Sequence, residues 1–182
     1  MKKIFLILSI CLIGACGTDT DDSKSETPPP GFIEGVEVTV DEMNREYNLY
    51  VPQSLPEGPV PLLLAFHGGG GRGWAYPQQA QFQALADSEG LLIAYPQAEL
   101  MPGNEGEWQL NTPDEGRHDI RYVEAIIDQV ASRFNLEENR VYATGYSLGS
   151  MFTYELACHL SSRFAASSGD SPGSIKPFGK PT

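Results

Sequence analysis

The sequence has few basic residues, few cysteines and few histidines, and each shortage excludes a class of protein. Its 182 residues contain 12 Lys and Arg against 24 Asp and Glu, which gives a formal net charge of −12. A chain this acidic repels nucleic-acid phosphates, so no nucleic-acid partner is expected. Three cysteines are too few for a disulfide scaffold, and no CxxC or His/Cys ligand spacing occurs. We therefore expect no metal ion and no other cofactor.

The chain also lacks an apolar run that is long enough to cross a membrane. The N-terminal run, residues 4–13, follows Lys2 and Lys3 and is shorter than the ~20 residues of a spanning helix, which is typical of a signal peptide. Residues 12–15 followed by Cys16 resemble the bacterial lipobox, whose cysteine is acylated. We expect residues 1–15 to be a lipoprotein signal peptide and Cys16 to carry the lipid. The alternative is an ordinary signal peptide that is cleaved near Ala15.

This leader implies an extracytoplasmic protein that is lipid-anchored to a bacterial membrane, at the outer membrane or the cell surface, or secreted. Residues 16–32 are acidic and rich in proline with almost no apolar side chain, so we expect them to form an extended tether. The rest of the chain suits one domain, because 41% of all residues are hydrophobic. Cys158 falls on a predicted helix in this domain, where we expect a buried thiol.

Apolar patterning predicts an α/β fold. Residues 35–40 and 46–51 alternate polar and apolar side chains and indicate an antiparallel hairpin. Residues 62–66 and 91–95 are continuously apolar, as expected for strands that are buried on both faces of a sheet. Helical spacing predicts helices over residues 78–89 and 119–134, the second of them capped by Asp119.

A Gly-x-Ser-x-Gly sequence, Gly145-Tyr146-Ser147-Leu148-Gly149, follows an apolar strand and precedes an amphipathic helix. A sharp turn between strand and helix presents a serine hydroxyl clear of the backbone, where it can attack a carbonyl carbon. The five-residue pattern also occurs by chance. Its context between a strand and a helix favours a nucleophile elbow with Ser147 at its tip.

A glycine-rich segment, His67-Gly68-Gly69-Gly70-Gly71, follows the predicted strand 62–66. Glycines at a strand end let backbone N–H groups approach a developing oxyanion, as in the His-Gly-Gly-Gly loop of lipases and esterases. The alternatives are a flexible glycine turn or a phosphate-binding loop, but the Gly-Lys-Ser/Thr ending of the latter is absent. We interpret the segment as an oxyanion loop, in which His67 has a structural role and bonds neighbouring backbone.

The predicted loop of residues 96–118 carries one large aromatic residue, Trp108. Loops of this length in compact domains are usually functional or disordered. Trp108 either lines a substrate cleft or is an apolar plug that fixes the loop to the domain. His118, at the end of the loop, is expected to be solvated.

Several segments in order resemble the polyhydroxybutyrate depolymerase and feruloyl/acetylxylan esterase group of α/β-hydrolases, the carbohydrate esterase family 1 type. They are residues 45–52, residues 61–69, the helix from Asp119 and residues 139–151, followed by residues 156–158 and 163–166. The resemblance implies a three-layer sandwich, an N-terminal antiparallel hairpin followed by parallel strands. It implies Ser147 as nucleophile and the N–H groups of Leu148 and of Gly68 or Gly69 as the oxyanion hole. The implied substrate is an ester, in a polyester or a plant cell-wall polysaccharide.

The family normally continues after Ala166 with further strands, a catalytic Asp and a late His, whereas residues 169–182 read as a disordered tail. His159 lies twelve residues beyond Ser147 on the same predicted helix, about 18 Å along its axis, so it cannot serve as the base. We expect residues 33–168 to be a partial esterase domain that lacks its last strands, its catalytic acid and its histidine. Such a chain would be a truncated, weakly active, monomeric enzyme. The alternative is a non-catalytic surface lipoprotein that binds polysaccharide or polyester through the Trp108 loop.

Overall fold

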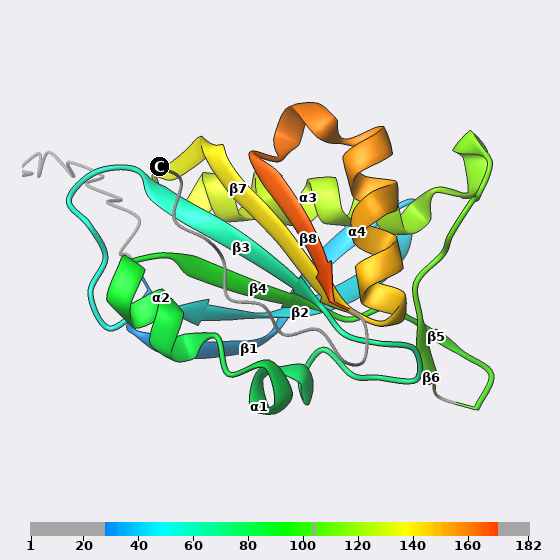
Figure 1. Ribbon diagram of the computed structural model, residues 1–182, viewed down its shortest axis with the longest axis horizontal. Coiled ribbons are helices and arrows are strands. Elements are labelled where there is room, and N and C mark those ends of the chain that lie inside the picture. The colour runs from blue at the N-terminus through cyan, green and yellow to red at the C-terminus, as the bar shows by residue number, and fades with distance from the viewer. Residues whose placement is uncertain (1–27, 104, 171–182) are drawn as a thin grey trace, which may run out of the picture.

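The computed structural model describes residues 28–103 and 105–170, and its centre is a mixed six-stranded sheet (Figure 1). The strands follow the order β1-β2-β4-β3-β7-β8 across the sheet. The pairs β1–β2 and β2–β4 are antiparallel, and β4–β3, β3–β7 and β7–β8 are parallel. The strands are β1 (Gly31–Val40), β2 (Met43–Val51), β3 (Val60–Phe66), β4 (Leu92–Pro96), β7 (Leu136–Tyr146) and β8 (Ala166–Asp170).

Helices cover both faces of this sheet (Figure 1). On one face lie α1 (Tyr76–Ala80) and α2 (Gln83–Glu89), and on the other lie α3 (His118–Arg133) and α4 (Leu148–His159). The arrangement is a three-layer α/β sandwich. It confirms the fold class that the sequence predicts.

The sheet separates two apolar cores, which explains the continuous apolar run of β3. Leu62, Leu64 and Phe66 pack in the core below α3 and α4, whereas Leu63 and Ala65 pack in the core below α1 and α2. Successive side chains of a strand point to opposite faces, so a strand with both faces covered has no position left for a polar residue. The prediction of a doubly buried strand at residues 62–66 is confirmed.

The predicted helix over residues 78–89 is wrong as a single element, because the chain breaks it at Gln81. This residue has φ of 52° in the left-handed region, and its N–H bonds the carbonyl of Pro77 to end α1. The second helix, α2, then runs to Glu89 and buries Ala86 against the sheet. The apolar periodicity does not indicate this break. Left-handed backbone is typical of Gly, Asn or Asp, and the residue at position 81 is a glutamine.

The predicted cap role of Asp119 is wrong, and His118, whose side chain is 32% exposed, begins α3 instead of ending the loop. Arg117 occupies the N-cap position of α3 without a side-chain cap, and Asp119 is 1% exposed and forms an ion pair with Arg45 at 2.8 Å. His118 is the first residue of α3, and its Nδ1–H donates to the Asp41 carboxylate at 2.8 Å. Both side chains contact residues more than 70 positions away in the sequence, which local pattern could not reveal.

Three smaller differences concern the loop, the tail and the thiol. Residues 96–118 include a short hairpin, β5 (Glu99–Met101) with β6 (Glu105–Glu107), and a 3-10 turn η1 (Asp114–Gly116). After α4 a second turn, η2 (Ser161–Arg163), leads into β8, which continues to Asp170, two residues into the predicted tail. Cys158 is exposed rather than buried, because it lies on the side of α4 that faces away from Leu156 and the sheet.

The predicted signal peptide, Cys16 and residues 171–182 lie outside the described residues. Within the part of the chain that the structure describes, no helix combines the length and the apolar character needed to span a bilayer. The lipid anchor therefore stays a prediction from the sequence.

The turn between β1 and β2 joins this hairpin to α3. Asp41 and Glu42 both have positive φ, 51° and 63°, as a two-residue hairpin loop requires. His118 and Arg121 of α3 donate hydrogen bonds to the Asp41 carboxylate, at 2.8 and 2.7 Å. These bonds hold the pKa of Asp41 below its ordinary value of 3.8.

We expect the Asp41→Asn substitution to lower the melting temperature at about pH 6 and to have a smaller effect at about pH 2. The folded-state pKa lies below the unfolded one, so the carboxylate stabilises the fold fully above about pH 4 and loses this effect as the pH falls through the folded pKa. Thermal unfolding followed by circular dichroism measures both points, with Glu57→Gln as an exposed control. An equal difference between Asp41→Asn and the parent chain at both pH values would contradict the prediction.

Candidate active site

Ser147 stands at the turn between β7 and α4 in a backbone conformation that non-glycine residues rarely adopt. Its φ is 52° and its ψ is −116°, outside the helical and extended regions, and α4 begins at the next residue. Residues in such strained conformations persist only where the surrounding structure holds them, and they cluster at functional sites. The local geometry is that of a nucleophile elbow.

The two glycines of the motif are required by close backbone approach. A Cβ on Gly145 would lie 2.3 Å from the carbonyl carbon and oxygen of Gly149. A Cβ on Gly149 would lie 2.4 Å from the carbonyl oxygen of Phe66 and 2.5 Å from that of His67. Only glycine therefore fits at both positions of the turn. The turn brings the start of α4 into contact with the end of β3.

The predicted oxyanion loop lies against the elbow. A Cβ on Gly68 would lie 3.5 Å from the Cβ of Ser147, and one on Gly69 would lie 3.4 Å from a methyl carbon of Leu148. The N–H groups of Gly70 and Gly71 bond the carbonyls of Gly106 and Gly68, at 2.9 and 3.0 Å. Within the described residues no such bond occupies the N–H groups of Gly68 and Gly69. The structure thus brings together the four residues that the sequence assigned to the site, Ser147, Leu148, Gly68 and Gly69.

His67 has both ring nitrogens engaged in structural hydrogen bonds. The Nε2 atom accepts the backbone N–H of Ala98 at 3.2 Å, so the ring proton is on Nδ1, which donates to the carbonyl of Gly68 at 2.7 Å. Burial lowers the pKa of His67 below its ordinary value and favours this neutral ring. The expected structural role of His67 agrees with this geometry.

Trp108 is a buried plug beneath the same loop. Only 3% of the residue is exposed, and its indole N–H donates to the carbonyl of His67 at 2.8 Å. The ring stacks on Phe152 with centroids 4.8 Å apart and meets Phe66 edge to face at 5.2 Å. Of the two interpretations drawn from the sequence, the plug describes this position, because a cleft-lining ring would be accessible to substrate.

Asp170, in the segment predicted to be a disordered tail, lies next to the elbow. It pairs with Tyr146 at the end of β8, and its carbonyl accepts the N–H of Ser147 at 2.9 Å. Burial, followed by the charge of Asp170, raises the pKa of Tyr76 to about 12, so Tyr76 stays protonated at neutral pH. Strand pairing across the sheet, which residue spacing does not show, places Asp170 beside Ser147.

The chain has three histidines, and none bonds the hydroxyl of Ser147 within the described residues. His67 is held as described above, and His118 bonds Asp41. His159, near the C-terminal end of α4, lies 3.6 Å from the Glu155 carboxylate. The prediction that His159 cannot reach Ser147 agrees with its position at the far end of the helix.

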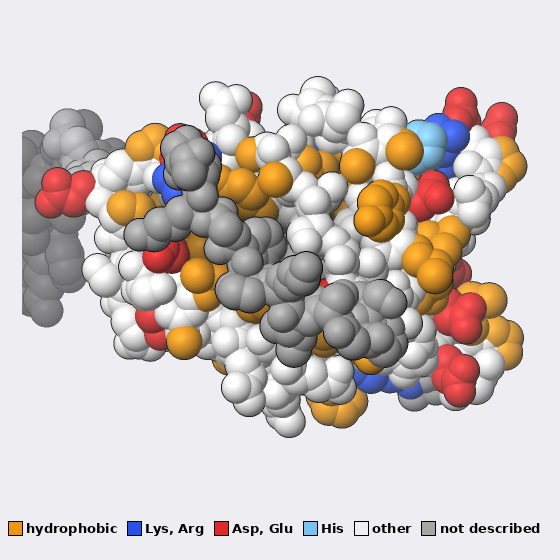
Figure 2. All heavy atoms as spheres, viewed as in Figure 1, with side chains coloured by type: hydrophobic (Ala, Val, Ile, Leu, Met, Phe, Trp, Pro, Cys, Tyr) orange, Lys and Arg blue, Asp and Glu red, His pale blue; other side chains and the backbone are white. Residues whose placement is uncertain are grey.

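Exposed apolar side chains lie at the end of β7 and along α4, whereas acidic side chains gather at another part of the surface. Tyr146, Met151 and Tyr154 are exposed on β7 and α4, and Figure 2 shows hydrophobic side chains on the surface over this helix. Acidic side chains gather at the end of the molecule that carries the β5–β6 hairpin (Figure 2).

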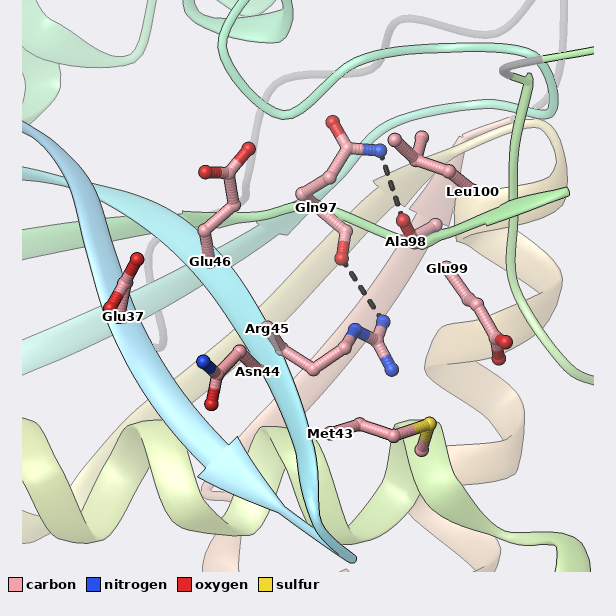
Figure 3. Close-up of a pocket in the computed structure, with 9 residues that line it drawn as sticks. All are labelled: Glu37, Met43, Asn44, Arg45, Glu46, Gln97, Ala98, Glu99 and Leu100. Atoms are coloured by element: carbon pink, nitrogen blue, oxygen red, sulfur yellow. Dashed lines mark hydrogen bonds between the residues drawn. The ribbon is translucent and has the colours of Figure 1, made fainter.

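A cavity of about 480 Å³ lies beyond the end of β4, two strands from β7 (Figure 3). Ser147 does not line it, so this cavity is not where a carbonyl would be attacked. The lining residues are Glu37, Met43, Asn44, Arg45, Glu46, Gln97, Ala98, Glu99 and Leu100.

Comparison with known proteins identifies the family. The esterase PHB depolymerase family matches residues 45–177, which include the elbow and the oxyanion loop. The chain belongs to the esterase PHB depolymerase family. The family resemblance drawn from the sequence motifs is confirmed.

Similar proteins include acetylxylan and feruloyl esterases. The chain is 33% identical over 123 residues to a bifunctional acetylxylan esterase/xylanase of Neocallimastix patriciarum. This alignment covers 67% of this chain and 17% of that protein. The chain is 27% identical over 172 residues to acetylxylan esterase A of Emericella nidulans, covering 91% and 55% of the two chains. The chain is 29% identical over 118 residues to feruloyl esterase B of Thermothelomyces thermophilus, and the alignment covers 63% of this chain and 39% of that protein.

Solved structures show the same fold. An acetyl xylan esterase from Aspergillus awamori superposes with a TM-score of 0.64 at 24% identity, covering 76% of this chain and 53% of that one. The serine hydrolase FphF of Staphylococcus aureus superposes with a TM-score of 0.61 at 16% identity, covering 77% and 56%. The chain spans at most about half the length of the curated relatives named above.

Proposed function

We propose that this chain is a serine ester hydrolase in which Ser147 is the nucleophile. The observation that carries the proposal is the strained backbone of Ser147. Gly68 and Gly69 lie beside the elbow, and among the described residues their N–H groups have no hydrogen-bond partner. A turn that only glycines permit on either side holds the serine in this conformation. Membership in an esterase family gives independent support.

In the proposed reaction, the Oγ atom of Ser147 attacks the ester carbonyl carbon, the C–O bond to the alcohol breaks, and the alcohol leaves with the serine proton. Water then hydrolyses the acyl-serine and releases the acid. Negative charge develops on the carbonyl oxygen, where the N–H of Leu148, at the first position of α4, and that of Gly68 or Gly69 can donate. One such donor is worth about 100- to 1,000-fold in kcat.

The proposed rate for this chain is low. Each of its three histidines has a partner away from Ser147, so none accepts the serine proton directly. A serine with an oxyanion hole and no base retains about 10³- to 10⁴-fold acceleration over water, far below a full triad. We infer a weakly active esterase that turns over activated esters more readily than polymeric ones.

For the substrate we propose an acyl ester of a plant cell-wall polysaccharide or a polyester. The support is the family name and the acetylxylan and feruloyl esterases among the relatives. The alternative, a binding protein that uses the Trp108 loop, finds no support in the structure, because Trp108 is buried. Lipid attachment at Cys16 remains a proposal from the sequence, which the mass of the mature N-terminal peptide would test.

We expect a fluorophosphonate probe to label Ser147, with formation of the serine O–P bond and loss of fluoride. Mass spectrometry of the digested chain should find the adduct on the peptide that contains Ser147, and the Ser147→Ala variant should lose it. Ser132→Ala, an exposed serine on α3, is the matched control and should be labelled like the parent chain. A folded parent chain that takes up no probe at Ser147 overturns the proposal.

A further inference from the structure

We propose that Gln97 is a positioning residue for the oxyanion loop and that a buried ion pair between Arg45 and Asp119 holds it in place. The inference rests on the proposed esterase function, in which the loop of residues 67–73 supplies donors to the oxyanion. It goes further by naming the side chain that fixes the loop from outside. No contact of Gln97 with substrate is implied.

The side chain of Gln97 reaches the far end of the loop. Its Oε1 atom accepts the N–H of Gly73 at 2.8 Å, and its Nε2 atom donates to the carbonyl of Ala98 at 3.0 Å. The residue is 6% exposed. A Cβ on Gly106 would lie only 2.8 Å from the Nε2 atom, so the backbone of Gly106 lies close to the amide and any side chain at this position would collide with it.

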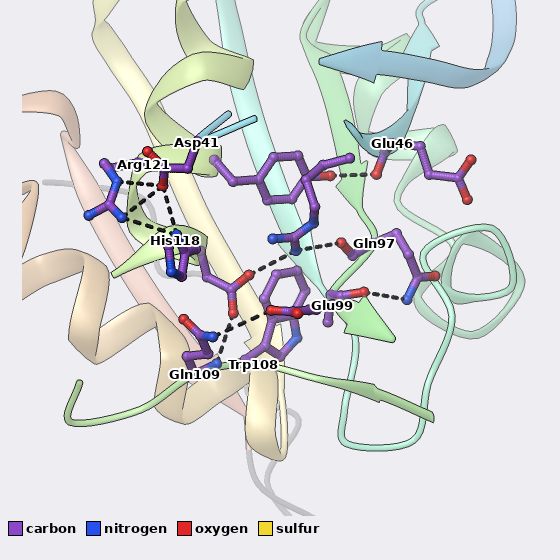
Figure 4. A network of polar contacts seen from close by, with 12 residues as sticks. Asp41, Glu46, Gln97, Glu99, Trp108, Gln109, His118 and Arg121 are labelled. Atoms are coloured by element: carbon purple, nitrogen blue, oxygen red, sulfur yellow. Dashed lines mark hydrogen bonds and ion pairs between the residues drawn. The ribbon is translucent and has the colours of Figure 1, made fainter. Parts of the chain in front are cut away.

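The main chain of Gln97 is fixed as firmly as its side chain. Its N–H donates to the carbonyl of Glu46 at 3.1 Å, and its carbonyl accepts from Nη2 of Arg45 at 3.1 Å. The same Nη2 atom bonds the Asp119 carboxylate at 2.8 Å. Figure 4 shows this network around Gln97, together with Glu46 and Gln109.

The ion pair ties three separate segments to Gln97. Arg45 lies on β2 and stacks over the ring of Tyr122 with its guanidinium carbon 4.2 Å from the centroid. Asp119 lies in the first turn of α3 and accepts the N–H of Gln109 at 2.8 Å with its other oxygen. Both charged side chains are buried, at 7% and 1% exposure. Buried pairs gain little net stability after desolvation, so a role in fixing geometry is the better account of this one.

The loop needs such external support because its own residues provide little. Gly68 to Gly71 have no side chains that could pack, so their position depends on bonds at the ends of the loop. At one end His67 is held by Ala98, and at the other Gly73 is held by Gln97. Donors in a catalytic site must be held within about 0.5 Å of the productive geometry. A shift of about 1 Å can cost about 100-fold in rate.

The test compares Gln97→Met with Gln109→Met. Methionine has a similar length but cannot accept the N–H of Gly73, so the rate of fluorophosphonate labelling at saturating probe should fall, by up to about 100-fold, while the probe concentration for half-maximal rate changes little. Gln109→Met makes the same chemical change at a side chain that bonds Glu99 and not the loop, and it should keep the parent rate. Gln97→Glu, which retains an acceptor oxygen for Gly73, should recover part of the loss.

Hydrogen exchange separates this inference from the proposed function. In Gln97→Met the amide of Gly73 should exchange faster, and in Gln109→Met it should not, whether or not Ser147 reacts with the probe. If the parent chain is not labelled, the proposed esterase function is contradicted, but the positioning role of Gln97 is not. A Gln97→Met chain with parent-like exchange at Gly73, or with labelling within about twofold of the parent rate, overturns the positioning role. If Gln97→Met does not fold, Arg45→Lys keeps the charge but cannot span both Gln97 and Asp119, and the same two measurements decide.

Discussion

Replacing Gly149 by alanine should destabilise the fold by about 3 kcal/mol and abolish labelling of Ser147. The new methyl group would lie 2.4 and 2.5 Å from the carbonyl oxygens of Phe66 and His67. Both neighbours are backbone atoms at the end of a central strand, so they cannot yield as a flexible side chain would. To relieve the overlap α4 must move away from β3, which pulls Leu148 and Ser147 away from the oxyanion loop.

The control for this prediction is Gly58→Ala, in an exposed loop where no heavy atom lies within 4 Å of the new Cβ. It should change the free energy of unfolding by about 0.5 kcal/mol or less. Urea denaturation of both variants, with probe labelling at Ser147 under native conditions, measures the two effects. A Gly149→Ala chain as stable and as reactive as the parent would show that the elbow is not closed as described.

Replacing Trp108 by alanine should cost about 3 to 5 kcal/mol of unfolding free energy, as expected for a large aromatic residue removed from a core. The indole packs between Phe66 and Phe152, and its N–H bonds the carbonyl of His67. The substitution leaves a cavity and an unpaired buried carbonyl at the start of the oxyanion loop. We therefore expect Trp108→Ala to lose reactivity at Ser147 as well as stability.

Trp74→Ala is the matched control, because the same side chain is removed from a residue that is 62% exposed. Its unfolding free energy should stay within about 0.5 kcal/mol of the parent value. Thermal and urea unfolding measure the difference between the two tryptophan variants. Equal stability losses would contradict the assignment of Trp108 as the buried plug and Trp74 as a surface residue.

Some features of this protein follow from the sequence because their causes are local. The continuous apolar run at residues 62–66 predicts a strand covered on both faces, since no polar residue fits there. The Gly-x-Ser-x-Gly motif predicts the elbow, because its glycines are the residues whose missing Cβ atoms permit the turn. The glycines after His67 likewise predict a loop that approaches other backbone closely.

Other features depended on contacts between distant segments, and only the tertiary structure decided them. Asp119 at a helix start is an ordinary cap by pattern, but the fold brings it to Arg45, 74 residues away in the sequence. Trp108 reads equally well as a cleft residue or a plug, and its ring packs on Phe66 and Phe152.

The sequence by itself therefore determined the α/β class, the position of Ser147 and the glycine loop opposite it, because backbone conformation and strand burial are encoded in neighbouring residues. The tertiary structure decided that Asp170 ends β8 beside Ser147 and that Gln97 fixes Gly73. Such pairings arise from strand order and register across the sheet. The spacing of residues along one segment predicts neither of these two contacts.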